Sequence, residues 1–382
     1  MKGTMGKIRP YRTAAAGLLL FAVFAGTSAA PPLPEAHEAH AAAAALTGSQ
    51  LSDAIFQKLK ARSESFTVQA PGSASASLQT VNQAFEAAMN RDDYIRYAIQ
   101  SYRYSAVSDG RKATVSIRVA YWENAAQSAY VDAKVGQIAA SIFTKGMNDH
   151  QKVKAVHDWV LLHVAYDRTL RKHSAYDALA SGQTVCQGYA SLTYLLLRKG
   201  GVAARIVEGT VPTGAHAWNL VKLDGKWYHL DTTFDDPVPD EKGRTEYGYY
   251  LLTDGQIRAD HAWTAAYPAA NTSYEATLDG LLRSDPSRKA FYSGLERTLG
   301  YPYLLPENTV RSTADLAARL KAAVKAGKSE LTVRYAGGAN VPLDLQALLD
   351  AVPALTSIRS SASRFPAGGP YDVLLTLRFT AK

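Results

Sequence analysis

The sequence of 382 residues predicts an α+β fold, in which a group of helices comes before an antiparallel sheet. Along the central part, helical periodicity comes first and alternating, strand-like segments follow: helices at 134–143, 149–164 and 184–201, strands at 203–210, 215–223 and 226–233. The dipeptide Asp224-Gly225 joins the last two strands and is typical of a two-residue hairpin turn. A similar small α/β pattern lies at each end of the chain.

Residues 1–29 have the pattern of a secretory signal peptide. Four basic residues stand first, an apolar run covers 14–25, and small residues at 27–30 offer a cleavage site. The apolar run is shorter than the roughly 20 residues that span a bilayer. We therefore expect export, a mature protein that is secreted or held in the cell envelope, and no transmembrane segment in the mature chain. Residues 30–46, rich in proline and alanine, are expected to form a linker.

Two segments outside the central part share one order of elements. In 47–130 the patterns predict a helix, a strand, a second helix and two strands, with the strands at 65–69, 94–104 and 113–122. In 309–382 the same order returns, with helices at 315–324 and 343–352 and strands at 330–335, 356–364 and 371–379. We expect two similar modules with a structural or recognition role. The chain is thus expected to divide into a signal peptide (1–29), a linker (30–46), an N-terminal α/β module (47–130), a central domain (131–270), a connecting segment (271–308) and a C-terminal α/β module (309–382).

The charge distribution argues against a nucleic acid partner. The chain carries 42 Lys and Arg against 34 Asp and Glu, a formal net charge of +8. Four basic residues and no acidic ones fall in 1–29, so the mature chain keeps about +4. The basic residues are dispersed and show no zinc-knuckle or helix-turn-helix spacing. His150, His157 and His163 lack a recognised ligand spacing, so we expect packing or surface roles for them, and no metal or other cofactor.

The only cysteine, Cys186, lies at the predicted start of a helix. Thr184 with Gln187 three positions later forms a capping-box pattern, so Thr184 is expected to be the N-cap and Cys186 to lie in the first turn. Backbone N–H groups and the helix dipole stabilise a thiolate there, and the thiolate is the reactive form of a cysteine. A single cysteine also excludes an internal disulfide. Taken alone, such a residue is more often an inert buried thiol.

The Asp-Gly turn fixes the register of the predicted hairpin. If Leu223 pairs with Lys226, His216 and Asp231 lie on one face of the sheet as diagonal neighbours. Diagonal Cβ atoms are about 7–8 Å apart or somewhat less, a span that an imidazole and a carboxylate close with a hydrogen bond. A histidine oriented by an acid is what a cysteine nucleophile requires. Rivals for the two roles stand nearby in the sequence, namely His229, Asp235 and Asp236.

Three motifs in order carry a family resemblance: Val185-Cys-Gln-Gly-Tyr-Ala190, Ala215-His-Ala-Trp-Asn-Leu220, and Gly-Lys-Trp-Tyr-His-Leu-Asp-Thr-Thr-Phe-Asp-Asp-Pro at 225–237. Together with 249–254 and 261–263 they resemble the transglutaminase-like superfamily of cysteine peptidases and acyltransferases, as an exported bacterial member, over about 131–268. The resemblance implies a papain-like core, with a helix packed on an antiparallel sheet. It also implies that Cys186 is the nucleophile, His216 the general base and Asp231 the orienting acid.

Such an enzyme would form an acyl-enzyme at Cys186 from a peptide or carboxamide carbonyl. We expect hydrolysis, because the resemblance is to small bacterial members and because the sequence contains no calcium-loop pattern. Protein cross-linking through a lysine amine is one alternative, and a non-catalytic cell-surface binding or scaffold protein with a vestigial triad is another. The expected partner is a peptide or protein substrate, such as a cell-wall peptide or surface protein. The backbone N–H of Cys186 should donate to the oxyanion, with Gln183 or Tyr176 as candidates for a second donor.

Overall fold

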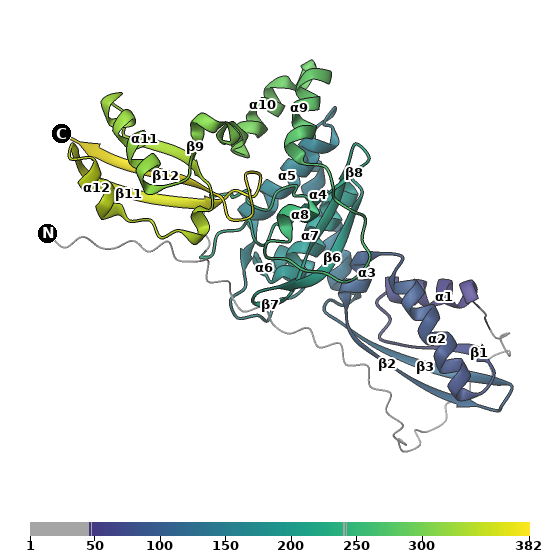
Figure 1. The fold of residues 1–382 in the computed structure, drawn as a ribbon. Coiled ribbons are helices and arrows are strands. Elements are labelled where there is room, and N and C mark those ends of the chain that lie inside the picture. Colours follow the sequence, from purple (N-terminus) through teal and green to yellow (C-terminus); the bar gives the residue numbers. More distant parts are fainter. Residues whose placement is uncertain (1–45, 47, 240, 242) are drawn as a thin grey trace.

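The computed structural model describes residues 46, 48–239, 241 and 243–382. The expected signal peptide and all but one residue of the expected linker lie outside the described residues. Figure 1 shows a central part with one small α/β module at each of two opposite ends. Within the described part of the chain, no helix combines the length and the apolar character that crossing a membrane requires.

The central part confirms the predicted α+β core. Its helices come first, and they are α4 (Ala125–Ile142), α5 (Asp149–His163), α6 (Ala175–Ser181) and α7 (Cys186–Lys199). The antiparallel sheet follows in the order β6-β7-β8, formed by β6 (Ala204–Val211), β7 (Gly214–Leu223) and β8 (Lys226–Leu230). Two short strands, β4 (Ala165–Tyr166) and β5 (Gln183–Thr184), pair in parallel just before α7. Helix α4 runs across the expected module boundary at 130/131.

Helix α7 packs against the sheet through an apolar face. Tyr189, Leu192 and Leu196 are fully buried, in one core that also takes side chains of the sheet. The Asn219 side-chain amide on β7 donates to the Ala190 carbonyl at 3.0 Å and so ties sheet to helix. Burying apolar surface of this extent is what holds the helix in place. The first turn of α7, which carries Cys186, is thereby fixed on the rigid sheet.

The predicted N-cap of α7 is wrong. The capping position is Val185, which offers no side-chain hydrogen bond. The Thr184 hydroxyl instead donates to the carbonyls of Lys172 and Ser174, at 3.1 and 3.3 Å. Gln187 likewise turns away, and its amide donates to the Tyr97 carbonyl at 2.7 Å. Tertiary contacts with the loop at 172–174 and with helix α3 (Asp93–Ala98) therefore take the place of the local capping box.

The hairpin register agrees with the prediction from the turn. Asp224 and Gly225 have φ of 48° and 81°, as a type I′ turn requires. Leu223 pairs with Lys226 and Asn219 with Leu230. The pairing stops there, because β8 ends at Leu230. The two further pairs that the register would give, Trp218 with Asp231 and His216 with Thr233, are not formed.

The two end modules share their order of elements and of strands. The N-terminal module contains α1 (Gly48–Lys60), β1 (Ser65–Pro71), α2 (Ala74–Met89), α3 (Asp93–Ala98), β2 (Ile99–Ser108) and β3 (Lys112–Tyr121), with strand order β1-β3-β2. The C-terminal module contains β9 (Thr309–Val310), α11 (Thr313–Lys325), β10 (Glu330–Tyr335), α12 (Leu345–Ala351), β11 (Leu355–Arg364) and β12 (Val373–Ala381), with strand order β11-β12-β10-β9. In both modules the third long strand lies between the other two.

The strand expected at 94–104 begins only at Ile99. Residues 93–98 form α3 instead, because the Asp92 side chain caps the helix and accepts from the Ile95 N–H at 3.1 Å. Helix α3 brings the N-terminal module against the central sheet. Its Asp93 binds Arg205 of β6 through an ion pair of 2.7 Å.

The expected connecting segment contains α9 (Tyr274–Ser284) and α10 (Lys289–Thr298). Their buried side chains, among them Tyr274 and Tyr292, belong to the same apolar core as α5 and α7. A short helix, α8 (Asp254–Ile257), lies between the sheet and these helices in the chain. The central core therefore extends beyond the sheet into this segment.

Candidate active site

Cys186 is the first residue of α7, and only 6% of its surface is exposed. Strand β5 leads into it, and the Val185 N–H donates to the Lys172 carbonyl at 2.8 Å. The loop that holds Lys172 is ordered by Asp167, whose carboxylate accepts from the backbone N–H groups of Arg171 and Lys172 at 2.9 Å each. The thiol thus lies at a helix start that the neighbouring loop at 167–172 holds in place.

His216 on β7 and Asp231 directly after β8 meet through their side chains. His216 Nε2 lies 2.7 Å from Asp231 Oδ2, and both residues are buried. The other oxygen, Oδ1, accepts from the N–H groups of Thr233 and Phe234 at 2.9 and 3.2 Å. The chain turns directly after β8, and this turn aims the carboxylate at His216. The expected contact is therefore present, although the strand ends before the acid.

Electrostatics favour a charged pair. Burial by itself would lower the pKa of His216, but the charge and hydrogen bond of Asp231 and a further interaction with Cys186 raise it to about 10. Burial by itself would raise the pKa of Asp231, but His216 and a second histidine, His261, hold it well below its ordinary value. Because Nε2 faces Asp231, Nδ1 is the imidazole nitrogen left for the thiol. Cys186, His216 and Asp231 thus form one connected site.

His261 is a second histidine beside Asp231, and the sequence motifs assign it no role. Its Nε2 lies 3.0 Å from the same Asp231 oxygen that His216 contacts, and its Nδ1 lies 2.7 Å from Asp260 Oδ1. The segment is held at the edge of the sheet by Ala262, which pairs with Thr210 of β6 through two backbone hydrogen bonds of 2.8 Å. A single histidine in a loop carries no periodicity that would place it. Only the motif at 261–263 marked this segment in the sequence.

The rivals named from the sequence are engaged elsewhere. The Trp218 indole N–H donates to His229 Nδ1 at 2.8 Å, and His229 Nε2 lies 2.8 Å from Asp254. Burial lowers the pKa of His229 to about 4, so this ring is neutral near pH 7. Asp236 accepts from the Tyr189 hydroxyl at 2.6 Å. His229 thus supports the sheet rather than the thiol.

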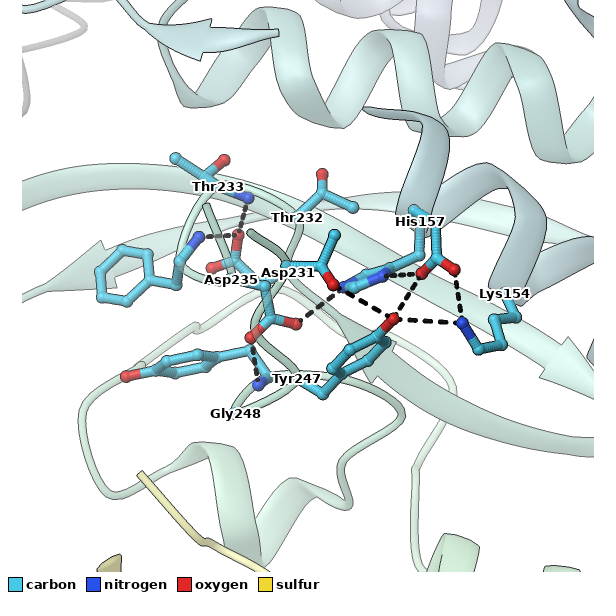
Figure 2. Close-up of polar contacts among 12 residues, drawn as sticks. Lys154, His157, Asp231, Thr232, Thr233, Asp235, Tyr247 and Gly248 are labelled. Atoms are coloured by element: carbon cyan, nitrogen blue, oxygen red, sulfur yellow. Dashed lines mark hydrogen bonds and ion pairs between the residues drawn. The ribbon is translucent and has the colours of Figure 1, made fainter. Parts of the chain in front are cut away.

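Asp235, the third rival, belongs to a buried network behind the acid (Figure 2). His157 of α5 lies between Asp158 and Asp235, at 3.0 and 3.1 Å. Burial raises the pKa of Asp235 to about 6 against the opposing effect of His157. Asp235 Oδ1 also accepts from the Tyr249 N–H at 2.7 Å. This network fixes the turn that bears Asp231 to helix α5.

The two candidates for a second oxyanion donor make their contacts with other residues. Gln183 is exposed, and its side-chain amide oxygen Oε1 accepts from Lys172 Nζ at 2.9 Å. The Tyr176 ring packs edge-on against Tyr130. Tyr166 of β4 lies near Cys186 and Asp231. Burial, and then the charges of Cys186, Asp167 and Asp231, raise the pKa of the Tyr166 hydroxyl. Its hydroxyl therefore stays protonated as a hydrogen-bond donor.

Ligand atoms of His216, Asp231 and His261 lie within 4.8 Å of one another, close enough for a metal ion to bridge. We assign no metal to this cluster, since the same atoms already pair with one another and all three residues are buried. Of the histidines on α5, His150 and His157 are buried and hydrogen-bonded to carboxylates, and His163 is exposed and stacks on Trp159.

A thiol at a helix start, facing an imidazole that a buried carboxylate orients, is the arrangement that cysteine-dependent acyl-transfer enzymes use. Residues 136–232 match the Transglutaminase-like superfamily, and the matched range contains Cys186, His216 and Asp231. Residues 136–232 of the central part therefore form a transglutaminase-like domain.

Two curated relatives were found, both named kyphoscoliosis peptidase. The human protein is 28% identical over 130 residues, and the mouse protein is 27% identical over 128 residues. Each match covers 29% of this chain but only 20% and 19% of the relative, so the chain spans about a fifth of their length. A solved structure of a TGase is 16% identical to this chain. The match covers 47% of this chain and 54% of the TGase chain, with a TM-score of 0.25, so no inference is based on it.

Proposed function

We propose that this protein is an exported cysteine enzyme that hydrolyses peptide or carboxamide bonds through an acyl-enzyme at Cys186. The observation that carries the proposal is the hydrogen bond of 2.7 Å between His216 and Asp231, with the other imidazole nitrogen left for the thiol. This arrangement supplies a nucleophile, a base and an acid that orients the base. The enzymatic character of the superfamily supports it further.

In the first half-reaction, the Cys186 thiolate attacks the carbonyl carbon and forms a C–S bond. The carbonyl oxygen takes the negative charge and accepts a hydrogen bond from the Cys186 N–H. The His216 imidazolium then gives its proton to the leaving nitrogen, the C–N bond breaks, and the amine departs. A thioester and a neutral His216 remain.

In the second half-reaction, the neutral His216 takes a proton from water as the water attacks the thioester. The C–S bond breaks, the carboxylic acid leaves, and the thiolate with its imidazolium is restored. Asp231 keeps its charge throughout and fixes the tautomer of His216. If a lysine amine replaced the water, the same site would cross-link proteins. We propose hydrolysis, in line with the peptidase name that the curated relatives carry.

The proposal is tested by incubating the protein with a mixed peptide library and with glutamine-containing peptides plus a lysine analogue. Mass spectrometry distinguishes products that gained water from products that gained the amine. We expect hydrolysis that Cys186→Ala abolishes. Equal turnover by the wild type and Cys186→Ala would sink the enzyme proposal, and amine incorporation faster than hydrolysis would favour cross-linking.

Export is part of the proposal and has its own test. It rests on the basic and apolar pattern of residues 1–29. When the full chain is expressed in a bacterial host, we expect the protein outside the cytoplasm with its first residues removed. N-terminal sequencing that finds an intact Met1 on cytoplasmic protein would contradict export.

A further inference from the structure

The mechanism above leaves one buried histidine of the site without a task. Both ring nitrogens of His261 face carboxylate oxygens, Asp231 at 3.0 Å and Asp260 at 2.7 Å. A carboxylate only accepts hydrogen bonds, and a neutral imidazole has one donor. His261 therefore makes both bonds to ionised carboxylates only as a doubly protonated, positively charged ring.

Asp260 is in turn held by a residue of the C-terminal module. Arg364, the last residue of β11, has its Nε 3.7 Å from Asp260 Oδ2. Its guanidinium donates to the carbonyls of Gly248 and Gln256 at 3.2 and 3.0 Å, and lies 4.3 Å from the centre of the Tyr249 ring. The Tyr249 hydroxyl donates to the same Asp260 oxygen at 2.6 Å. Arg364 thus binds the segment that follows the acid at several points.

Charges of opposite sign alternate along this row of side chains. Arg364 is positive, Asp260 negative, His261 positive and Asp231 negative, and the row ends with the His216 imidazolium and the Cys186 thiolate. Each charge has an opposite neighbour, which is how buried charges are tolerated. Opposite neighbours also lower the pKa of Asp260, although burial by itself would raise it.

We propose that His261 is a positively charged positioning residue for Asp231, and that Arg364 makes the C-terminal module part of the active site by holding His261 in place through Asp260. The inference rests on the proposed function and deepens it. In physical terms, the charge of His261 offsets that of Asp231. Without it, the Asp231 carboxylate would repel the thiolate, and less Cys186 would be ionised near neutral pH.

The ring of His261 is surrounded largely by other rings. Its ring lies 5.3 Å from the His216 ring and packs against Trp218, Phe234 and Tyr249, at 5.0, 4.9 and 5.4 Å between ring centres. The titratable and charged groups that face it from these elements are Asp231, Asp260, His216, His229, Tyr249 and Arg364. Among them, only Asp231 and Asp260 bind its nitrogens.

The test measures alkylation of Cys186 by iodoacetamide from about pH 5 to about pH 9. Because the chain has one cysteine, the mass of the intact protein reports on this site alone. His261→Phe removes the charge and both hydrogen bonds. We therefore expect the acid limb of the profile, the range in which the alkylation rate rises with pH, to move up by about one pH unit, with roughly tenfold slower alkylation near pH 6.5. His261→Gln, which keeps a donor for Asp231, should lie between. Arg364→Gln should shift the profile in the same direction by less, with alkylation about threefold slower near pH 6.5.

Arg378→Gln is the matched control, since this exposed arginine on β12 pairs only with Glu330 among the described residues. It should behave as the wild type. A uniform slowing with the limb in place, or a wild-type profile in His261→Phe, overturns the proposal. If His261→Phe does not fold, the two Gln variants decide by the same shift. A wild-type limb near pH 8.5, as for an ordinary thiol, overturns the proposed function and this inference with it.

Discussion

Asp231→Asn removes the charge of the proposed acid while keeping its shape. In the protein, Oδ2 faces two imidazole nitrogens, those of His216 and His261, and Oδ1 faces the N–H groups of Thr233 and Phe234. An amide has one oxygen and one NH2 group. In either orientation of the Asn side chain, the NH2 group faces two hydrogen-bond donors, either the two imidazoles or the two backbone N–H groups.

If the NH2 group faces the imidazoles, His216 has to accept at Nε2 and carry its proton at Nδ1, which is the tautomer that cannot take the thiol proton. If it faces the backbone, two buried N–H groups lose their acceptor. The active tautomer of His216 therefore requires the second orientation, in which two backbone N–H groups have no acceptor. At about 2 kcal/mol for each of these groups, this orientation costs about 4 kcal/mol. We therefore expect kcat and the rate of Cys186 alkylation near neutral pH to fall about 10³-fold.

Alkylation by iodoacetamide near pH 6.5 is the assay, because it needs no knowledge of the substrate. Cys186→Ala provides the blank and circular dichroism shows whether the variant is folded. A folded Asp231→Asn protein whose alkylation stays within about threefold of the wild type would refute the tautomer argument.

Three further outcomes are expected. In Gly188→Ala, the new Cβ would lie 1.9 Å from the Thr184 hydroxyl, so we expect a loss of about 1–3 kcal/mol and a lower Tm in calorimetry; an unchanged Tm would contradict the packing. In His229→Leu, two buried hydrogen bonds are lost, so Tm should fall while the pH profile of alkylation keeps its position; a shifted profile would give His229 a part in the site. The stability that wild type has over Asp231→Asn should vary with pH. Since folding raises the pKa of His216 from 6.5 to about 10, the contribution of His216 to the free energy of unfolding is full below pH 6.5 and is lost as pH rises through about 10. Since folding lowers the pKa of Asp231 from 3.8, the contribution of Asp231 to the free energy of unfolding is present above pH 3.8 and is lost as pH falls below that value. Urea titrations should therefore show the widest gap near pH 5, and a gap that widens toward pH 10 would contradict the charge pairing.

The contact between His216 and Asp231 could be predicted because strand geometry is regular. A two-residue turn and a side-chain period of two leave one register, which brings β7 and the end of β8 side by side. The turn after Leu230, which the register does not describe, then aims Asp231 at His216. The helix start was harder to predict. The capping pattern at Thr184 is local, whereas its hydroxyl binds the carbonyls of Lys172 and Ser174, which are distant in sequence.

His261 could not be placed from the sequence, since a loop residue has no period. Its position depends on the bridge between Ala262 and Thr210, which joins segments about 50 residues apart. The end modules were predicted less completely than the hairpin but better than the position of His261. Their repeated order of elements was readable, but α3 was missed, because Asp92 caps a helix whose residues also suit a strand.

The hydrogen bond from Gln187 to the Tyr97 carbonyl bears on how this protein can be divided. The residue beside the proposed nucleophile is anchored to a segment that lies well before the range matched to the superfamily, 136–232. A chain trimmed to that range would leave a buried amide without its acceptor, at the first turn of α7. The stretch that identifies the ancestry of this protein is therefore smaller than the stretch that must fold together for the thiol to be placed, and expression of shortened variants should keep residues from 48 onward.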